Sequence, residues 1–522
     1  MNEGILVQDV ESEADTTDAE AAVGHLQSSS TDEESRKNLR DQLRRTLSHK
    51  QSASGNTSSC RRISYSHPSK TPVPHGIASK YPPREYFVLT DAGKPVFVSR
   101  PGAEDSDNMT AAVGIMQALI SVFLDDDDKL RCINAGSTRI TFLLRPPLYY
   151  VCASSWGEPE SVTRSHLEYL HLQILSVVTA SQLLRIFERR TNFDLKRLLN
   201  GAEGFLTSLL DRLEFDLSMS TASLHCLRID PALRKQAADA LIPAHKMKEI
   251  LYVLLVAKGQ VITLLRPRKH SIHPADIHIL LNTVYSPSIL LSPAASSWIP
   301  ICLPRFNASG FVNAYISFLH RDSDEISPQT SEEPESPKTI RSRPLPPVEG
   351  NPNFALVCIS GGGEFETIRT WCDSVTQKLR DDGILDVILQ EIRSGGCTYS
   401  VSELGIPGLR HFVYKSRAQV QITQPVFEEP YDRHQERRRL ITLYQIIHDA
   451  IHAKSGQTNT LKLQYLRTEH ECVMGWITQP FELWVTLSPR LPKSAAVKAA
   501  NAVARWVKKE EVRLFLRDAP VF

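Results

Sequence analysis

Two stretches carry residue types that bind phosphate or metal ions in other proteins. Ser360–Glu366 (SGGGEFE) lies between a predicted strand and a predicted helix, which is the usual place of a phosphate-binding loop. No Gly-Lys-Ser/Thr follows it and the GxGxxG spacing fails, so a strand-to-helix turn is the better interpretation. Asp125–Lys129 offers four consecutive carboxylates as Mg²⁺ ligands, but such a run at a helix end is typical of a solvated loop.

Three histidines, His270, His273 and His278, are close together in sequence. No cysteine or carboxylate lies at zinc-ligand spacing beside them, and His273 before Pro274 is better interpreted as a helix-start residue. The sequence also lacks GxSxG, and its Ser, His and Asp residues are too dispersed to propose a catalytic triad. We therefore predict no metal, no cofactor and no enzyme of covalent chemistry.

Composition narrows the class of protein further. The 522 residues carry a formal net charge of +1, which argues against a nucleic-acid binder. The nine cysteines are scattered and form no CxxC pair, as in proteins of a reducing compartment. Neither a signal peptide nor an apolar run of about 20 residues is visible. These features predict a cytoplasmic protein that touches membranes only from outside.

The first 79 residues have an uneven charge distribution. Residues 1–35 hold ten Asp or Glu and no Lys or Arg, whereas Arg36–Lys80 is basic and Ser-rich with the single carboxylate Asp41. Such segments have too little apolar area to offset the entropy of ordering. We expect residues 1–79 to be a disordered tail.

The elements that position any site begin with a hairpin. EYFVLT and PVFVSR flank a DAGK turn in which Gly93 supplies a positive φ. A helix with apolar residues at a spacing of four follows at Met109–Phe123, then three strands and two long helical patterns, the first of them SHLEYLHLQILSVVTASQLLRIFERR. The order of strand, strand, helix, three strands and helices defines a first unit at 80–215.

Similar patterns recur twice. A second hairpin, EILYVLLVA and QVITLLRP across KGQ, lies in a unit at 216–322, and FALVCIS opens a third unit at 353–522. Residues 323–352 are rich in Pro, Ser and charge, as expected for a disordered linker. The sequence thus predicts an α+β protein of three antiparallel sheets, each covered by helices.

This order matches longin or roadblock-like architecture, and several blocks resemble one family more closely. YYVCASSWGEPESVTRSHLEYLHLQILSVVT, HPADIHILLN, WIPICLPRFNASGFVNAYISFL, LRHFVYKSRAQVQIT and LKLQYLRTEHECVMGW are similar to the signature blocks of the Mon subunits of Mon–Ccz exchange complexes. The resemblance covers essentially Lys80–Phe522. It implies three longin domains in a Rab guanine-nucleotide exchange factor of late endosomes and vacuoles.

The resemblance also implies partners. In that family the first longin domain pairs with that of a Ccz-type subunit, the heterodimer binds the late-endosomal or vacuolar Rab GTPase, and neither subunit alone is active. An upstream early-endosomal Rab is a further possible partner. The implied location is peripheral, on endosome, multivesicular body and vacuole membranes, in fusion, endosome maturation, autophagy and transport to the vacuole.

Trp156 follows the fifth strand of the first unit in a Gly- and Pro-containing loop. Exposed tryptophans at strand ends often anchor protein interfaces, although a Trp that covers its own helix is an equal alternative. Apolar excess on the first helix indicates a partner surface there. The resulting candidates for binding the GTPase or partner subunit are Trp156, Gly157, Glu158, Arg164, His166, Met116 and Ile120.

Basic clusters are candidates for an anionic lipid or phosphoinositide surface, since each Lys or Arg near such a surface contributes about 1 kcal/mol. These candidates are Arg36, Lys37, Arg40, Arg44 and Arg45 in the tail, with Arg266, Arg268 and Lys269 in a folded domain. Disordered tails and polar turns carry such clusters without this function too.

An exchange factor needs no bond-making residue, because it acts by preferring the nucleotide-free GTPase. The alternative from another class is a non-catalytic longin scaffold, or a coat or tether adaptor, that binds GTP-loaded GTPases. Both need exposed apolar surface, so the sequence leaves the two open.

Overall fold

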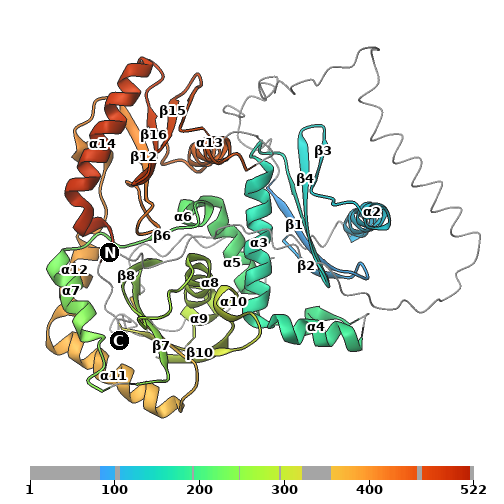
Figure 1. Ribbon diagram of the computed structural model, residues 1–522, viewed down its shortest axis with the longest axis horizontal. Helices are drawn as coiled ribbons and strands as arrows, with labels where there is room; N and C mark the ends of the chain where they lie inside the picture. The colour runs from blue at the N-terminus through green and yellow to red at the C-terminus, as the bar shows by residue number, and fades with distance from the viewer. Residues whose placement is uncertain are drawn as a thin grey trace, which may run out of the picture. The chain divides into compact units, whose positions relative to one another are not determined.

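The computed structural model contains three β-sheets flanked by helices (Figure 1). Helix α2 (Ser106–Asp125) belongs to one compact unit and every other described element to a second, and each unit is described by itself. The tail at 1–79 and the linker at 323–352 lie outside the described residues. Those residues are 83–99, 106–190, 193–245, 247–292, 296–319, 354–454 and 461–517.

The first sheet is antiparallel, in the order β2-β1-β5-β4-β3. Its predicted opening hairpin is confirmed, with Gly93 at φ +78° in the turn. The strands pack on α3 in a core that contains Tyr150 and Leu170. The strands are β1 (Glu85–Thr90), β2 (Pro95–Val98), β3 (Cys132–Ala135), β4 (Thr138–Arg145) and β5 (Leu148–Ser154).

The long helical pattern after β5 was predicted as one helix, and this is wrong. It forms α3 (Glu160–Val177) and α4 (Ala180–Arg189), bent by 82°. The Thr179 hydroxyl accepts the backbone N–H of Gln182, so a residue inside the apolar pattern caps a new helix. Beyond them lie η1 (Leu195–Arg197), α5 (Glu203–Phe215) and α6 (Leu217–Ser220).

None of the described helices is by itself long and apolar enough to cross a bilayer. The α3–α4 pair passes on length and composition only when its two bent halves are joined, and most of α3 is buried in the protein.

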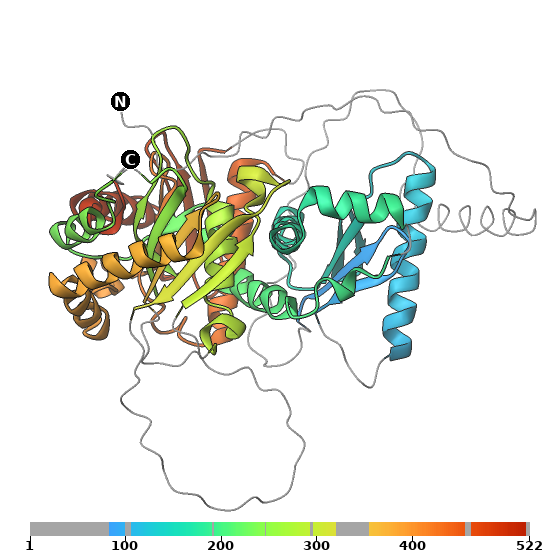
Figure 2. The same cartoon turned by 90° about the horizontal axis from the view of Figure 1, so that it is seen from below.

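The second sheet has the order β8-β7-β11-β10-β9. Helix α8 packs on one face, and α7, α11 and α12 pack on the other (Figure 2). Lys258 and Gly259, both at positive φ, make the predicted β7–β8 turn. The strands are β7 (Ile250–Ala257), β8 (Gln260–Leu265), β9 (Ser296–Ile301), β10 (Val312–Phe318) and β11 (Ala355–Ser360). The helices are α7 (Pro231–Ala240), α8 (Pro274–Val284), α9 (Pro287–Leu290), α10 (Pro304–Asn307), α11 (Phe365–Asp381) and α12 (Ile384–Arg393).

Strand β11 corrects the predicted domain boundary at 353. It pairs with β7 and β10 in the middle of the second sheet, so FALVCIS belongs to the second domain and not the third. The Pro- and Ser-rich sequence at 323–352 therefore connects β10 and β11 of the second domain and does not separate two domains. The Ser360–Glu366 stretch then joins β11 to α11, as the predicted strand-to-helix turn.

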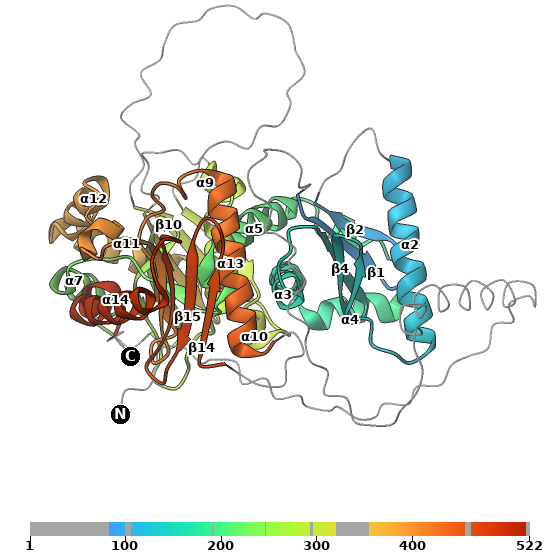
Figure 3. The same ribbon diagram turned by 90° about the horizontal axis from the view of Figure 1, so that it is seen from above.

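The third sheet has the order β14-β15-β16-β12-β13-β6. Helices α13 (His434–His452) and α14 (Lys493–Leu514) cover opposite faces (Figure 3). Strand β6 (Leu224–His225), predicted in the second unit, pairs in parallel with β13 and so joins this sheet. The other elements are η2 (Val401–Leu404), β12 (Leu409–Ser416), β13 (Gln421–Thr423), β14 (Leu463–Arg467), β15 (Cys472–Ile477) and β16 (Phe481–Leu487). The predicted α+β class is confirmed.

Gly475 on β15 lets α13 approach the third sheet closely. An added Cβ would press into the side chains of Ile447 and Ile451. We predict that Gly475→Ala destabilises the third domain by about 1–3 kcal/mol through overpacking. Gly204→Ala is the matched control, since a Cβ there meets nothing within 4 Å and Ala favours the helix. Thermal unfolding of the two variants checks this, and an equal effect of both would refute the tight α13 contact.

Candidate functional site between the first and third domains

Trp156, the main sequence candidate, is only 5% exposed, so the assumption that it is exposed is wrong for this chain. The guanidinium carbon of Arg84 lies 3.8 Å from the centroid of the indole ring and that of Arg438 lies 3.5 Å from it. Arg84 belongs to the first domain, but Arg438 comes from α13 of the third. Trp156 thus lies at a junction between two domains of one chain.

Glu158 is buried in the same place. Its Oε1 lies 2.7 Å from the Nε of Arg84 and accepts the Ser154 hydroxyl at 2.7 Å, while Arg139 donates to its backbone carbonyl. Burial lowers the pKa of Arg84, but Glu158, Tyr86 and Cys152 together outweigh it and leave the pKa above its usual value. Both charges are therefore committed to an internal pair.

His166 on α3 is also buried, and its Nδ1 lies 2.8 Å from the Tyr86 hydroxyl. Burial, with a smaller contribution from Arg84, holds the His166 pKa well below its usual value, so the ring is neutral. Its Nε2 has no hydrogen-bond partner among the described residues.

The remaining candidates of this set lie elsewhere. Gly157 is exposed, at φ +81°, and the half-exposed Arg164 pairs with Glu160 at 3.4 Å. Met116 and Ile120 lie one turn apart on α2, on one face of that helix. The structure therefore gathers Trp156, Glu158 and His166, and leaves Gly157 and Arg164 outside this group.

Helix α13 makes the junction on the third-domain side. Arg438 donates through Nε to Glu214 of α5 at 3.0 Å, and His434 Nε2 lies 3.5 Å from the same carboxylate. Near the other end of α13, Ser161 of α3 donates to Asp449. Both ends of α13 are thus bound to helices of the first domain. Nothing in the sequence around Arg438 distinguishes it from its arginine neighbours.

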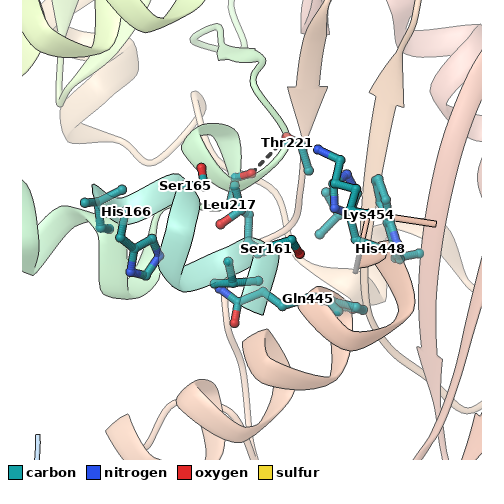
Figure 4. Close-up of a pocket in the computed structure, with 14 residues that line it drawn as sticks. Ser161, Ser165, His166, Leu217, Thr221, Gln445, His448 and Lys454 are labelled. Atoms are coloured by element: carbon teal, nitrogen blue, oxygen red, sulfur yellow. Dashed lines mark hydrogen bonds between the residues drawn. The ribbon is translucent and has the colours of Figure 1, made fainter. Parts of the chain in front are cut away.

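A cavity of about 40 Å³, room for about three waters, lies in the same junction (Figure 4). Figure 4 shows Ser161, Ser165 and His166 of α3 on one side and Gln445, His448 and Lys454 on the other. Both amide atoms of Gln445 and the Trp484 Nε1 have no partner among the described residues. The arrangement is suited to holding small polar species and supplies no nucleophile–base pair. The full lining is Ser161, Val162, Ser165, His166, Leu213, Leu217, Ser220, Thr221, Val413, Tyr444, Gln445, His448, Lys454 and Trp484.

The basic candidates divide in two. Arg268 and Lys269 are exposed and Arg266 half-buried in the loop between β8 and α8. The tail candidates Arg36, Lys37, Arg40, Arg44 and Arg45 lie outside the described residues.

The three histidines considered from the sequence do not converge. His273 caps α8, its Nδ1 accepting the backbone N–H of Ala275 at 3.0 Å, which confirms the helix-start interpretation. His278 Nε2 donates to the Ser223 carbonyl at 2.7 Å, and His270 packs edge-on against Phe306. The sequence analysis missed a different pair, His448 and His452, whose spacing of four on a helix was visible.

His278 gives a prediction for pH dependence. Burial lowers its pKa from 6.5 to about 4, so its contribution to stability is complete above pH 6.5 and is lost as the pH falls towards 4. Between pH 7 and pH 5 the unfolding free energy of the parent should fall because His278 is protonated only in the unfolded chain. In His278→Gln this fall should be smaller by roughly 2 kcal/mol. Urea unfolding across this range measures it, with exposed His270→Gln as the control. An unchanged pH slope in His278→Gln would contradict the assignment.

Arg438 gives a prediction for the junction. Arg438→Ala removes its hydrogen bonds to Glu214 and its stacking on Trp156, and should cost about 1–3 kcal/mol of local stability. Amide hydrogen exchange should rise in α3, α5 and α13. Arg433→Ala, an exposed arginine next to α13, is the control. Equal exchange in the two variants would show that Arg438 does not hold the domains together.

Comparison with known proteins gives the family. The chain matches the first, second and third longin domains of FUZ, MON1 and HPS1 at residues 84–209, 248–376 and 408–511. It is 51% identical to the vacuolar fusion protein MON1 of Cryptococcus neoformans (85% of this chain, 66% of that protein). It is 32% identical to MON1 of Mycosarcoma maydis (86% and 70%) and 33% identical to MON1 homolog A of Gallus gallus (83% and 72%).

The chain spans just under two thirds of the length of the Cryptococcus relatives that it matches. With three longin domains in matching order, and relatives of which it covers more than two thirds, the chain belongs to the MON1 family of vacuolar fusion proteins.

Proposed function

We propose that the chain is one subunit of a heterodimeric guanine-nucleotide exchange factor that activates a late-endosomal or vacuolar Rab GTPase for membrane fusion. The second subunit is a Ccz-type longin protein. The observation that carries the proposal is membership of a vacuolar fusion family through three longin domains in order. The same role places the pair in endosome maturation, autophagy and transport to the vacuole.

The proposed mechanism is conformational coupling. A surface that binds the nucleotide-free GTPase more tightly than the loaded form lowers the affinity of the GTPase for GDP by the same factor. GDP then dissociates, and GTP binds because it is more abundant. Such a surface must be held rigid, because mobility would reduce the difference between the two affinities. The contacts of α13 with α3 and α5 support this requirement by fastening the first domain to the third.

Burial separates the candidate residues into two proposed roles. Gly157 and Arg164, at the surface of the first domain, are proposed to contact the GTPase or the Ccz-type subunit directly. Met116 and Ile120 of α2 are buried, so they are proposed to support the partner-binding surface and not to contact a partner directly. Trp156, Glu158 and His166 are proposed to hold that surface in shape from beneath, because each is buried in the chain itself.

Membrane recruitment is proposed to use the exposed Arg268 and Lys269 with Arg266, and the tail arginines, on anionic lipid or phosphoinositide. Because surface charges are screened by salt, this attraction should weaken as ionic strength rises.

Nucleotide release tests the exchange activity. The purified chain with its Ccz-type subunit should accelerate loss of a fluorescent GDP analogue from a late-endosomal Rab by at least 10-fold. Arg164→Ala should slow that release, whereas Arg505→Ala, at an exposed site on α14, should not. A pair that leaves the release rate unchanged would overturn the proposal.

The scaffold or adaptor alternative predicts the opposite nucleotide preference. In a pulldown, an exchange factor retains more of the nucleotide-free GTPase, and an adaptor retains more of the GTP-loaded form. Preferential capture of the loaded form would replace the proposed function by the alternative.

A further inference from the structure

Two histidines and a glutamate meet at the end of α13. His448 and His452 are separated by four residues, so both point to one face of the helix, and their ring centroids lie 4.5 Å apart. Glu482 on β16 approaches from the sheet, with its Oε2 3.0 Å from the Nε2 of His452. One ligand atom from each of the three residues lies within 4.8 Å of the others.

We propose that His448, His452 and Glu482 form a binding site for a divalent transition-metal ion, for which Zn²⁺ is the best match. Two imidazole nitrogens and one carboxylate oxygen are a ligand set used by zinc, and imidazole also suits copper and nickel better than magnesium or calcium. The helical spacing of four brings both imidazoles to one ion, as in zinc-binding helices.

The protonation states favour metal binding. Burial, followed by the nearby Lys454 and His452, holds the His448 pKa well below its usual value, so its ring is neutral and has a free lone pair. Burial raises the pKa of Glu482, but His452, Lys415 and Arg417 together lower it by a larger amount. The net pKa is below its usual value, and the carboxylate is ionised. His448 and Glu482 are therefore available as ligands near neutral pH.

The neighbouring cations set limits on the affinity. Lys415 Nζ and Arg417 Nε each lie 3.8 Å from the Oε1 of Glu482, which leaves Oε2 for the ion. Lys415 also donates to the Thr221 carbonyl at 2.9 Å, which helps to keep its ammonium group beside Oε1 of Glu482. Lys415 and Arg417 orient the Glu482 carboxylate, as residues around a metal site do. Their positive charges should make zinc binding weaker than at closed structural zinc sites.

His448 also lines the junction cavity, so the remaining coordination positions of an ion adjoin a polar space. The site joins the last turn of α13 to β16. A bound ion would stabilise the end of α13 at which Asp449 accepts the hydrogen bond from Ser161 of the first domain.

Zinc binding tests the proposal without any GTPase. The full chain, purified without a histidine tag and stripped with chelator, is titrated with ZnCl₂ against a chromophoric zinc chelator and then measured by elemental analysis. We expect one Zn²⁺ per chain. His448→Ala and His452→Ala should lower the affinity at least 10-fold, and exposed His245→Ala should not.

Glu482→Gln keeps the side-chain shape and should also weaken binding, which covers the case in which a histidine variant fails to fold. At a free zinc concentration 100 times the Kd of the parent, the unfolding equilibrium constant of the parent should fall about 100-fold, and that of Glu482→Gln should fall about 10-fold or less. Less than 0.1 Zn²⁺ per parent chain, or equal affinity in His452→Ala and His245→Ala, would overturn the proposal.

Discussion

The docking of α13 on the first domain is the contact on which the arrangement of this chain depends. Arg438 stacks on Trp156 and pairs with Glu214, and Asp449 accepts a hydrogen bond from Ser161. These contacts join residues more than 200 positions apart in sequence. Because partly buried charged groups between domains cost free energy unless they are paired, the contacts also favour one fit of the two domains.

The junction combines packing with buried polar groups that the described residues only partly satisfy. Glu158 pairs with Arg84 through Oε1, but its Oε2 has no partner among the described residues, and neither do His166 Nε2 and the amide atoms of Gln445 beside the cavity. A half-satisfied polar network is a poor way to gain stability, and such networks are commonly kept for a function. This makes the end of α13, with the cavity and the His448–His452 pair, the most chemically distinctive part of the described chain.

Much of the fold was predictable because local sequence patterns determine its strands, turns and helices. The β1–β2 hairpin needed only two short apolar runs and Gly93, and α2 needed only apolar residues at a spacing of four. What failed was long-range pairing. Strand β11 was assigned to the wrong sheet because a composition change looks the same within a domain as between domains. Strand β6 has two residues and is defined by its partner β13 alone.

The site was less predictable than the fold for the same reason. Trp156 was singled out from the sequence, but its contact with Arg438 could not be predicted, because the sequence places Arg438 among several similar arginines. The His448–His452 spacing was visible, while Glu482, the third member of the group, becomes its neighbour only in the folded sheet. Spacing along a helix can be read from sequence, and contact across a sheet or between domains cannot.

A double-mutant cycle between Trp156 and Arg438 tests the cross-domain contact most directly. Stabilities of the parent chain, Trp156→Ala, Arg438→Ala and the double variant, measured by hydrogen exchange in α3 and α13, give the coupling between the two side chains. The account predicts a favourable coupling of about 0.5–2 kcal/mol. Additive effects, with coupling indistinguishable from zero, would contradict the claim that α13 fastens the first domain to the third.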